Sequence, residues 1–288
     1  MTNTTDKIVN RIRNEHRQRR FAMKIQQKLD RALESYIRIN ATDWNPDMVE
    51  KEREKINTYV KTLIKDVRAG KDSPFVGVVQ TSDKARLPAD DMRKTCEKQM
   101  EQLVRQLPIA KWFEGDDDDS SGNGGIRGIG ALGVATIIAE TGDLSNYPNV
   151  GKVWKRLGFA PYDGFAGSSW KRESWRPRAL SKEEWIDNPF SGQRYALIFQ
   201  VGLWLRNAQW IGKSKTDDGK GKPNGFYGEV YAKRRAHTAA THPGWSDGHA
   251  DKDAIRVMMK EFLKRLWLAW REIEYVEGYV PHVLQAAE

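Results

Sequence analysis

The chain has 288 residues, one cysteine, and 48 Lys and Arg against 39 Asp and Glu, a formal net charge of +9. The single Cys96 excludes an internal disulfide and any zinc site built from cysteines, which is typical of a reducing compartment. No apolar run approaches the roughly 18 residues of a membrane span, and no apolar signal core stands near the start. We therefore expect a cytoplasmic protein with no membrane partner. The positive charge, interspersed with 11 Trp and 9 Tyr, favours a nucleic acid as partner.

The first hundred residues are predicted to be helical. Apolar residues at helical spacing predict one long helix over residues 6–40 and a second over 47–69. Their stripes, from Ile8 to Ile37 and from Ile56 to Val67, are typical of a helical hairpin or coiled coil, within one chain or between the chains of a homo-oligomer. Arginines crowd the first half of the first helix, where they either follow a phosphate backbone or form a solvated face. Residues 74–88 are expected to be a strand or an ordered loop, and a third helix is expected over 89–107.

Composition changes sharply at residues 114–125, which read EGDDDDSSGNGG. Without apolar side chains this stretch predicts a flexible linker, and its consecutive carboxylates repel each other rather than converge on a metal ion. We therefore divide the chain into a helical, coiled-coil-like domain (1–113), an acidic glycine-rich linker (114–125) and a second domain (126–288).

The second domain opens on a glycine-rich turn that leads into an apolar helix, GIRGIGALGVATIIAETG over residues 125–142. Free N–H groups at such a helix N-terminus form a binding site for an anion such as a phosphate. A dinucleotide fingerprint is disfavoured because no strand precedes the glycines. An ordinary turn between packed helices and a helix-hairpin-helix element, which grips phosphates without reading bases, are the remaining interpretations, and we favour the second. Its candidate nucleic-acid-binding residues are Arg127, Gly128, Ile129 and Gly130.

Further candidate residues follow the turn. A short helix over 150–157 carries Lys152, Lys155 and Arg156, and a loop rich in glycine and hydroxyl groups contains Ser168 and Ser169. The cations Lys171, Arg172, Arg176 and Arg178 stand among tryptophans that either stack bases or pack in a core. Helices are expected over 193–210, 227–235 and 252–274. A cluster of imidazoles and carboxylates between the last two is interpreted as a polar loop rather than a metal site; it consists of His237, His242, Asp247, His249, Asp251 and Asp253.

The segment from Gly128 to Pro161 resembles the helix-hairpin-helix-bearing transposase domain of the insertion-sequence 110 (and 116/902) family of DNA recombinases, and the likeness extends over about residues 124–275. That family combines a RuvC-like nuclease fold, which has an Asp-Glu-Asp-Asp metal quartet, with a coiled coil and a serine nucleophile. The resemblance implies Ser168 as the nucleophile, or Ser169 alternatively. This chain departs from the family pattern because its first hundred residues lack the strand-borne Asp, so we assign no metal ligands and no intrinsic cofactor. Magnesium would come through a partner.

These observations predict a mainly α protein with an N-terminal coiled-coil-like helical domain and a C-terminal helix-hairpin-helix, transposase-like domain. The predicted function is nucleic-acid binding in DNA transposition or site-specific recombination. DNA is the expected partner, and a structured RNA guide or a nuclease chain are further candidates. Two alternatives remain open: a serine recombinase subunit that uses Ser168, and an oligomeric helical scaffold whose basic charge is incidental.

Overall fold

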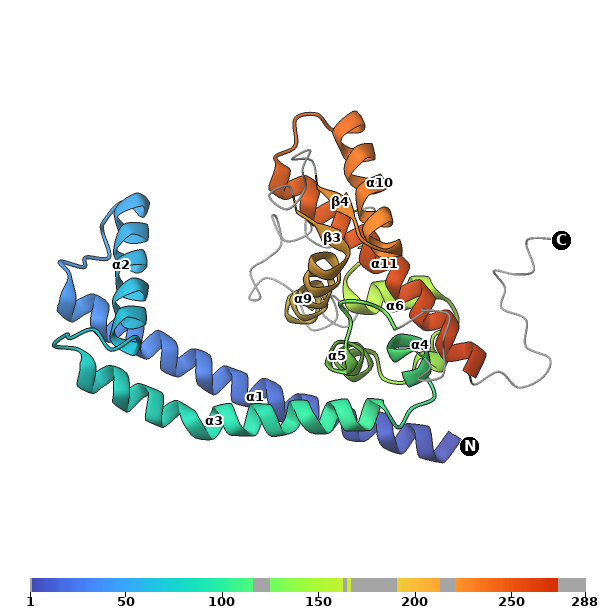
Figure 1. Ribbon diagram of the computed structural model, residues 1–288, viewed down its shortest axis with the longest axis horizontal. Coiled ribbons are helices and arrows are strands. Elements are labelled where there is room, and N and C mark those ends of the chain that lie inside the picture. Colours follow the sequence, from blue (N-terminus) through green and yellow to red (C-terminus); the bar gives the residue numbers. More distant parts are fainter. Residues whose placement is uncertain (1, 116–124, 163–164, 167–190, 213–220, 274–288) are drawn as a thin grey trace. The chain divides into compact units, whose positions relative to one another are not determined.

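The computed structural model describes residues 2–115, 125–162, 165–166, 191–212 and 221–273. Contacts divide the chain into two compact units, unit 1 (residues 1–13 and 100–288) and unit 2 (residues 14–99). The described residues are mainly helical (Figure 1), which confirms the predicted class. None of the helices in the described part of the chain combines the length and the apolar character that crossing a bilayer requires.

Unit 2 is built from three helices, α1 (Thr2–Ala41), α2 (Glu50–Arg68) and α3 (Val76–Val104), of which α1 and α3 also extend into unit 1. Ion pairs fix α1 antiparallel to α3. Arg19 Nε lies 2.9 Å from Glu97 Oε1, and eleven residues further along α1 the Asp30 carboxylate lies 2.5 Å from Nη1 of Arg86, eleven residues back along α3. The predicted helices over 6–40 and 47–69 are thus confirmed, and they pack within one chain.

The core of unit 2 explains why residues 76–88, most of the segment expected as a strand or loop, are helical. Val79 on α3 packs with Leu33 of α1 and Ile64 of α2 in one buried cluster. The valine-rich run at the start of α3 completes this cluster as a helix, so tertiary packing overrides the preference of valine for strands. The expectation of a strand or loop before residue 89 was wrong, and Pro88 lies inside α3.

The helices of unit 1 pack around one buried apolar cluster. The long helix α11 (Asp247–Ile273) packs against α9 (Gly192–Gln209), α10 (Phe226–Thr241) and α6 (Val150–Leu157), while α5 (Ala131–Thr141) packs against α9 and α6. The one-turn helices are α4 (Ala110–Glu114) and the 3-10 helix η1 (Leu144–Asn146). Two antiparallel ladders pair β1 (Pro161–Tyr162) with β2 (Phe165–Ala166), and β3 (Trp210–Ile211) with β4 (Lys222–Pro223).

The division by contacts differs from the division that composition predicts at residues 114–125. Met100, Val104, Leu107 and Phe113 are all buried in the same cluster as the side chains of α5, α9 and α11. The end of α3 and all of α4 therefore belong structurally to unit 1.

Candidate nucleic-acid interface

The predicted glycine turn is present and leads directly into α5. The N–H of Ile129 donates to the carbonyl of Ile126 at 3.1 Å, and Gly128 has a φ of +91°, which is typical of the third residue of a type II turn. Gly130 follows as the extended N-cap of α5, and Gly142 ends the helix as predicted, its N–H donating to the carbonyl of Ile138. The helix-hairpin-helix assignment itself stays a proposal.

Gly128 is required by the packing of the turn as well as by its φ. A Cβ at this position would lie 2.5 Å from Cβ of Ala208 and 3.0 Å from the carbonyl oxygen of Trp204, both on α9. The backbone of the turn therefore rests directly on α9. Gly130 is exposed, and a Cβ there would meet no atom within 4 Å. The two glycines thus have different roles, Gly128 in packing and Gly130 at the surface.

The surface of the turn carries an exposed cation and the N-terminus of α5. Arg127 is exposed, and no carboxylate among the described residues pairs with its guanidinium. The N–H groups of Gly130, Ala131 and Leu132 donate to no acceptor in the described part of the chain. Because a helix N-terminus carries a partial positive charge, this end of α5 favours an anion. Ile129, the remaining candidate in the turn, is buried.

A pocket of about 560 Å³ adjoins the turn. Its lining includes two arginines, Arg127 and Arg265, and none of its described lining residues is acidic. The lining residues are Trp112, Gly125, Ile126, Arg127, Gln209, Asn224, Gly225, Phe226, Tyr227 and Arg265. A pocket of this size, with flat aromatic walls and a net positive lining, is suited to an anionic ligand that carries a ring.

The aromatic wall of the pocket is held by the start of α10 and the middle of α11. Cζ of Arg265 lies 3.6 Å from the ring centroid of Phe226, and the Phe226 ring meets Tyr227 edge-on at 5.1 Å. Phe226 is 42% exposed, whereas Tyr227 is buried and packs on Phe262 of α11. Burial also raises the pKa of the Tyr227 hydroxyl, so this ring remains uncharged over the physiological range. The ring of Phe226 therefore faces solvent, and its contact with the buried Tyr227 holds it in place.

The basic candidates of α6 lie on a well-anchored helix. Asn149 caps its N-terminus by accepting from the N–H of Lys152. Nε1 of Trp154 donates to the carbonyl of Lys260 on α11 at 3.1 Å. Lys152 and Lys155 are both exposed. The predicted bounds of this helix, 150–157, match α6.

Arg156 is placed away from the turn. Its Nε donates to the carbonyl of Glu140, in the last turn of α5, whereas Arg127 and Gly130 precede the first turn of that helix. The length of α5, at about 1.5 Å per residue, separates these positions by roughly 15 Å. The structure therefore brings Arg127, Gly128, Ile129 and Gly130 together at one end of α5 and places Arg156 at the other.

Six predicted site residues lie outside the described residues. They are Ser168, Ser169, Lys171, Arg172, Arg176 and Arg178. The serine nucleophile and its flanking cations therefore stay predictions.

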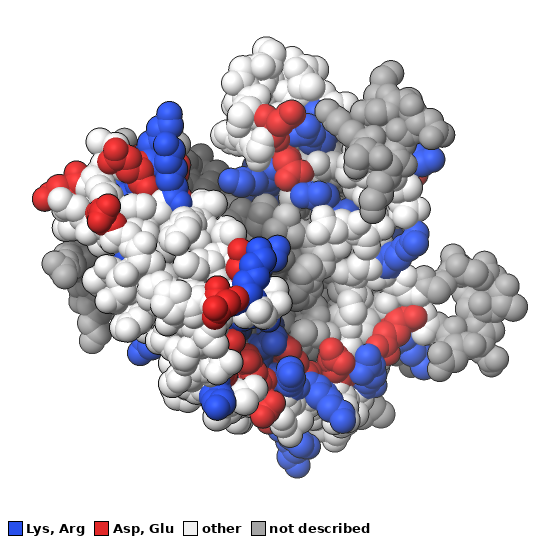
Figure 2. All heavy atoms as spheres, turned by 60° about the vertical axis from the view of Figure 1, so that its left-hand side comes forward, with Lys and Arg blue, Asp and Glu red and all other residues white. Residues whose placement is uncertain are grey.

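One arginine of the basic run in the first half of α1 forms an ion pair with α3. Arg19 is buried and its Nε donates to Glu97 of α3 at 2.9 Å, so this guanidinium holds two helices together. Cations and carboxylates are interspersed over the described part of the face shown in Figure 2. A continuous basic stripe along α1 is therefore a weaker candidate for phosphate binding than the turn.

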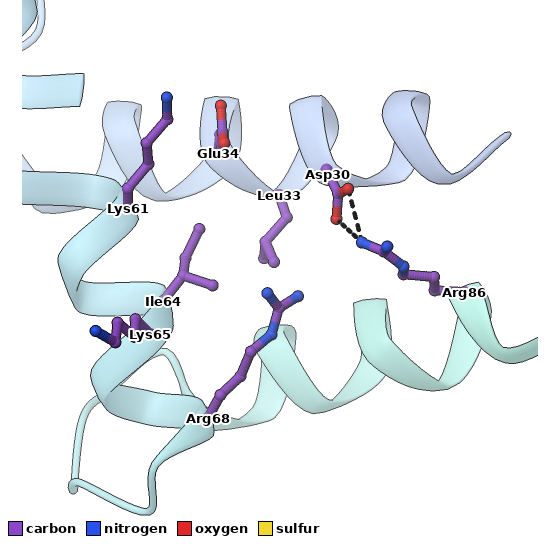
Figure 3. Close-up of a pocket in the computed structure, with 8 residues that line it drawn as sticks. All are labelled: Asp30, Leu33, Glu34, Lys61, Ile64, Lys65, Arg68 and Arg86. Atoms are coloured by element: carbon purple, nitrogen blue, oxygen red, sulfur yellow. Dashed lines mark hydrogen bonds and ion pairs between the residues drawn. The ribbon is translucent and has the colours of Figure 1, made fainter. Parts of the chain in front are cut away.

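A second pocket, of about 310 Å³, lies in unit 2 and has a mixed charge. Leu33 and Ile64 point toward one another between α1 and α2, and the guanidinium of Arg68 extends toward them (Figure 3). Asp30 and Glu34 also line it, and Arg86 binds Asp30 through two contacts of 2.5 and 2.7 Å. Two carboxylates thus stand among its four cations, whereas the described lining of the pocket beside the turn has no carboxylate.

The interpretation of the imidazole and carboxylate cluster as a polar loop was wrong except for His242, which lies between α10 and α11. His237 is on α10, and residues 247–253 form the first turns of α11. The carboxylates face arginines instead of each other: Asp251 pairs with Arg206, and Asp253 pairs with Arg234 and Arg256. Among the described residues no three His, Cys, Asp or Glu side chains converge on a possible metal position.

Sequence reasoning missed the residues that complete the pocket. Phe226, Arg265 and Trp112 come from three separate helices, and only tertiary packing brings them together. The one local signal was the motif Asn-Gly-Phe-Tyr-Gly at 224–228, in which turn residues precede two adjacent aromatic residues at a helix start.

Comparison with models of known protein families, with curated proteins and with solved structures finds no match to this chain.

Proposed function

We propose that this protein binds nucleic acid through the turn at residues 126–130, and that it acts as a transposase-related protein in DNA transposition or site-specific recombination. The observation that carries the binding proposal is the combination at one end of α5 of an exposed arginine, Arg127, with N–H groups that donate to no described acceptor. Backbone phosphates are recognised by such a pairing of a helix N-terminus with a cation. The role in recombination rests on the resemblance of residues 128–161 to the transposase domain.

The packing of the turn supports this proposal. The contact of Gly128 with α9 fixes the turn on the buried core of unit 1, so that its N–H groups are preorganised. A preorganised donor set loses little conformational freedom when an anion binds. The exposed ammonium groups of Lys152 and Lys155 add positive charge on α6. DNA is the proposed partner, and a structured RNA or a nuclease chain would complete the recombination machinery.

The test is fluorescence anisotropy of the full chain with a labelled DNA duplex over a series of salt concentrations. For about five phosphate contacts, we expect log K to fall against log salt with a slope of about −4 to −5. Arg127→Gln should reduce the magnitude of the slope by about 1 and weaken binding uniformly across DNA sequences.

The matched control is Arg53→Gln, at an exposed position on α2. This variant loses the same charge from unit 2 and should bind like the wild type. A salt-independent affinity would contradict backbone binding. An equal effect of the Arg53 and Arg127 variants would contradict the assignment of binding to the turn.

A further inference from the structure

We infer that the pocket beside the turn receives an unstacked nucleobase, so that the protein prefers single-stranded or locally opened nucleic acid over a closed duplex. This inference rests on the proposed function and names its substrate class. The base would stack on the surface formed by Phe226 and Arg265, while the phosphate of the same strand lies at the turn.

The first argument is the arrangement of the stacking surface. Arg265 lies over the ring of Phe226 at 3.6 Å, and both side chains remain substantially exposed, at 42% for Phe226 and 45% for Arg265. Aromatic rings and guanidinium planes are the surfaces on which unpaired bases stack, and each stacked base contributes about 1–3 kcal/mol. Since a base inside a duplex already stacks on its neighbours, only an unpaired base can use this surface.

The second argument is that the turn and the stacking surface belong to one pocket. Arg127 and Phe226 both line it, and the side chain of Gln209 links the backbone of Arg127 to that of Tyr227, the residue after Phe226. Nε2 of Gln209 donates to the carbonyl of Arg127, and its Oε1 accepts from the N–H of Tyr227. A strand whose phosphate is bound at the turn therefore has an aromatic surface beside it.

The charge of the pocket lining also supports the binding of a nucleic-acid strand. The described lining has two arginines and no carboxylate, and this positive charge favours a polyanion. Glu261, which pairs with Arg265 at 3.2 Å, does not line the pocket. Asn224 also lines the pocket. Its side-chain amide has both a donor and an acceptor, so it can form a hydrogen bond with the polar edge of any base.

The experiment compares binding of the full chain to a labelled oligothymidine of about 15 nucleotides with binding to a duplex of the same length. Phe226→Ala should weaken binding to the single strand by about 5- to 100-fold and change duplex binding by less than about twofold. Phe226→Trp should restore single-strand binding, because the indole also stacks. Phe21→Ala removes a phenyl ring that is 58% exposed from α1 in unit 2 and should bind like the wild type.

A photocrosslink locates the base independently of affinity. The same oligothymidine carrying one 5-iodouracil should crosslink to a peptide that contains Phe226 or Trp112. Unchanged single-strand affinity of a folded Phe226→Ala variant, or a crosslink elsewhere in the chain, would overturn the base pocket while leaving phosphate binding at the turn intact. If the wild type bound neither the single strand nor the duplex, the proposed function would itself be lost.

Discussion

Gln209 Nε2 donates a hydrogen bond to the backbone carbonyl of Arg127 at 3.0 Å, across 82 residues of chain. The same buried side chain accepts from the N–H of Tyr227, and the backbone carbonyl of Gln209 accepts from the N–H of Asn224. A Cβ at Gly228 would lie 1.9 Å from that carbonyl, so α10 approaches the end of α9 as closely as a backbone can. One glutamine thus connects the turn before α5 with the start of α10.

Removing this side chain should loosen both segments. Gln209→Ala leaves the Tyr227 N–H and the Arg127 carbonyl without their partner, and an unsatisfied buried group costs about 1–3 kcal/mol. We expect the free energy of unfolding, measured by urea denaturation, to fall by about 2–3 kcal/mol. Gln102→Ala, at an exposed position on α3 in the same unit, is the control and should leave the urea midpoint unchanged. A Gln209 variant as stable as this control would show that the two hydrogen bonds contribute nothing.

The glycines of the turn offer a matched pair of substitutions. Gly128→Ala introduces a Cβ 2.5 Å from Ala208 at a φ of +91°, so steric overlap and strain should together cost about 2–4 kcal/mol of stability. Gly130→Ala introduces the same methyl into open space at a φ of −86° and should cost less than about 1 kcal/mol, since alanine is a poorer N-cap. Thermal unfolding of the two variants checks this ranking. Similar melting temperatures would mean that the turn does not rest on α9.

Much of the fold could be predicted from apolar periodicity alone. The helix over 6–40 was predicted because its apolar residues recur at helical spacing, and the helix over 150–157 was predicted between a turn and Gly158. The first half of α3 was missed because its valines favour a strand locally, whereas the structure packs them as a helix in the buried cluster of unit 2.

The candidate site was predicted only in part. The turn is local in sequence, so its glycines and Arg127 could be identified. The stacking surface is not local, because Phe226 and Arg265 meet only when α10 packs on α11. Arg156 was grouped with the turn because it is near in sequence, whereas its hydrogen bond to Glu140 places it at the far end of α5. Spacing along the chain could not reveal at which end of a helix a distant cation docks.

A buried ion pair holds that far end of α5. Nε of Arg194 on α9 lies 2.9 Å from Oε2 of Glu140, and the two side chains are only 15% and 8% exposed. Removing one partner of such a pair leaves a buried charge, so Glu140→Gln and Arg194→Met should each destabilise the protein by about 3–5 kcal/mol. The control is the exposed pair of Arg68 with Asp83, whose coupling energy in a double-mutant cycle should be about 0–1 kcal/mol. A coupling energy for the buried pair no larger than that of the exposed pair would contradict its proposed role.

The last prediction concerns the pH dependence of stability at Asp253. This buried carboxylate accepts from Nε of Arg234 at 2.5 Å and from Nη2 of Arg256 at 2.8 Å. Burial alone would raise its pKa, but the hydrogen bonds and charges of the two arginines outweigh burial, and the pKa lies below its ordinary value. The folded protein therefore binds fewer protons at this site than the unfolded chain near pH 4. The stability that the carboxylate contributes is complete above its ordinary pKa of about 3.9 and is lost as the pH falls through the lower native pKa.

Asp253→Asn removes that contribution and leaves two arginines without their carboxylate. We expect the variant to be about 3 kcal/mol less stable than the wild type at pH 7, with the difference nearly constant down to about pH 5 and shrinking below about pH 4. Urea denaturation of both proteins between pH 7 and pH 3 measures this difference, and Asp43→Asn, at an exposed position after α1, should show no comparable change. A stability difference that stayed constant or widened toward pH 3 would mean that the arginines do not lower the pKa of Asp253. In that case, the contact between α10 and α11 would have to be held by their apolar residues and by the other polar pairs, such as Tyr231 with Asp251 and Arg235 with Asp247.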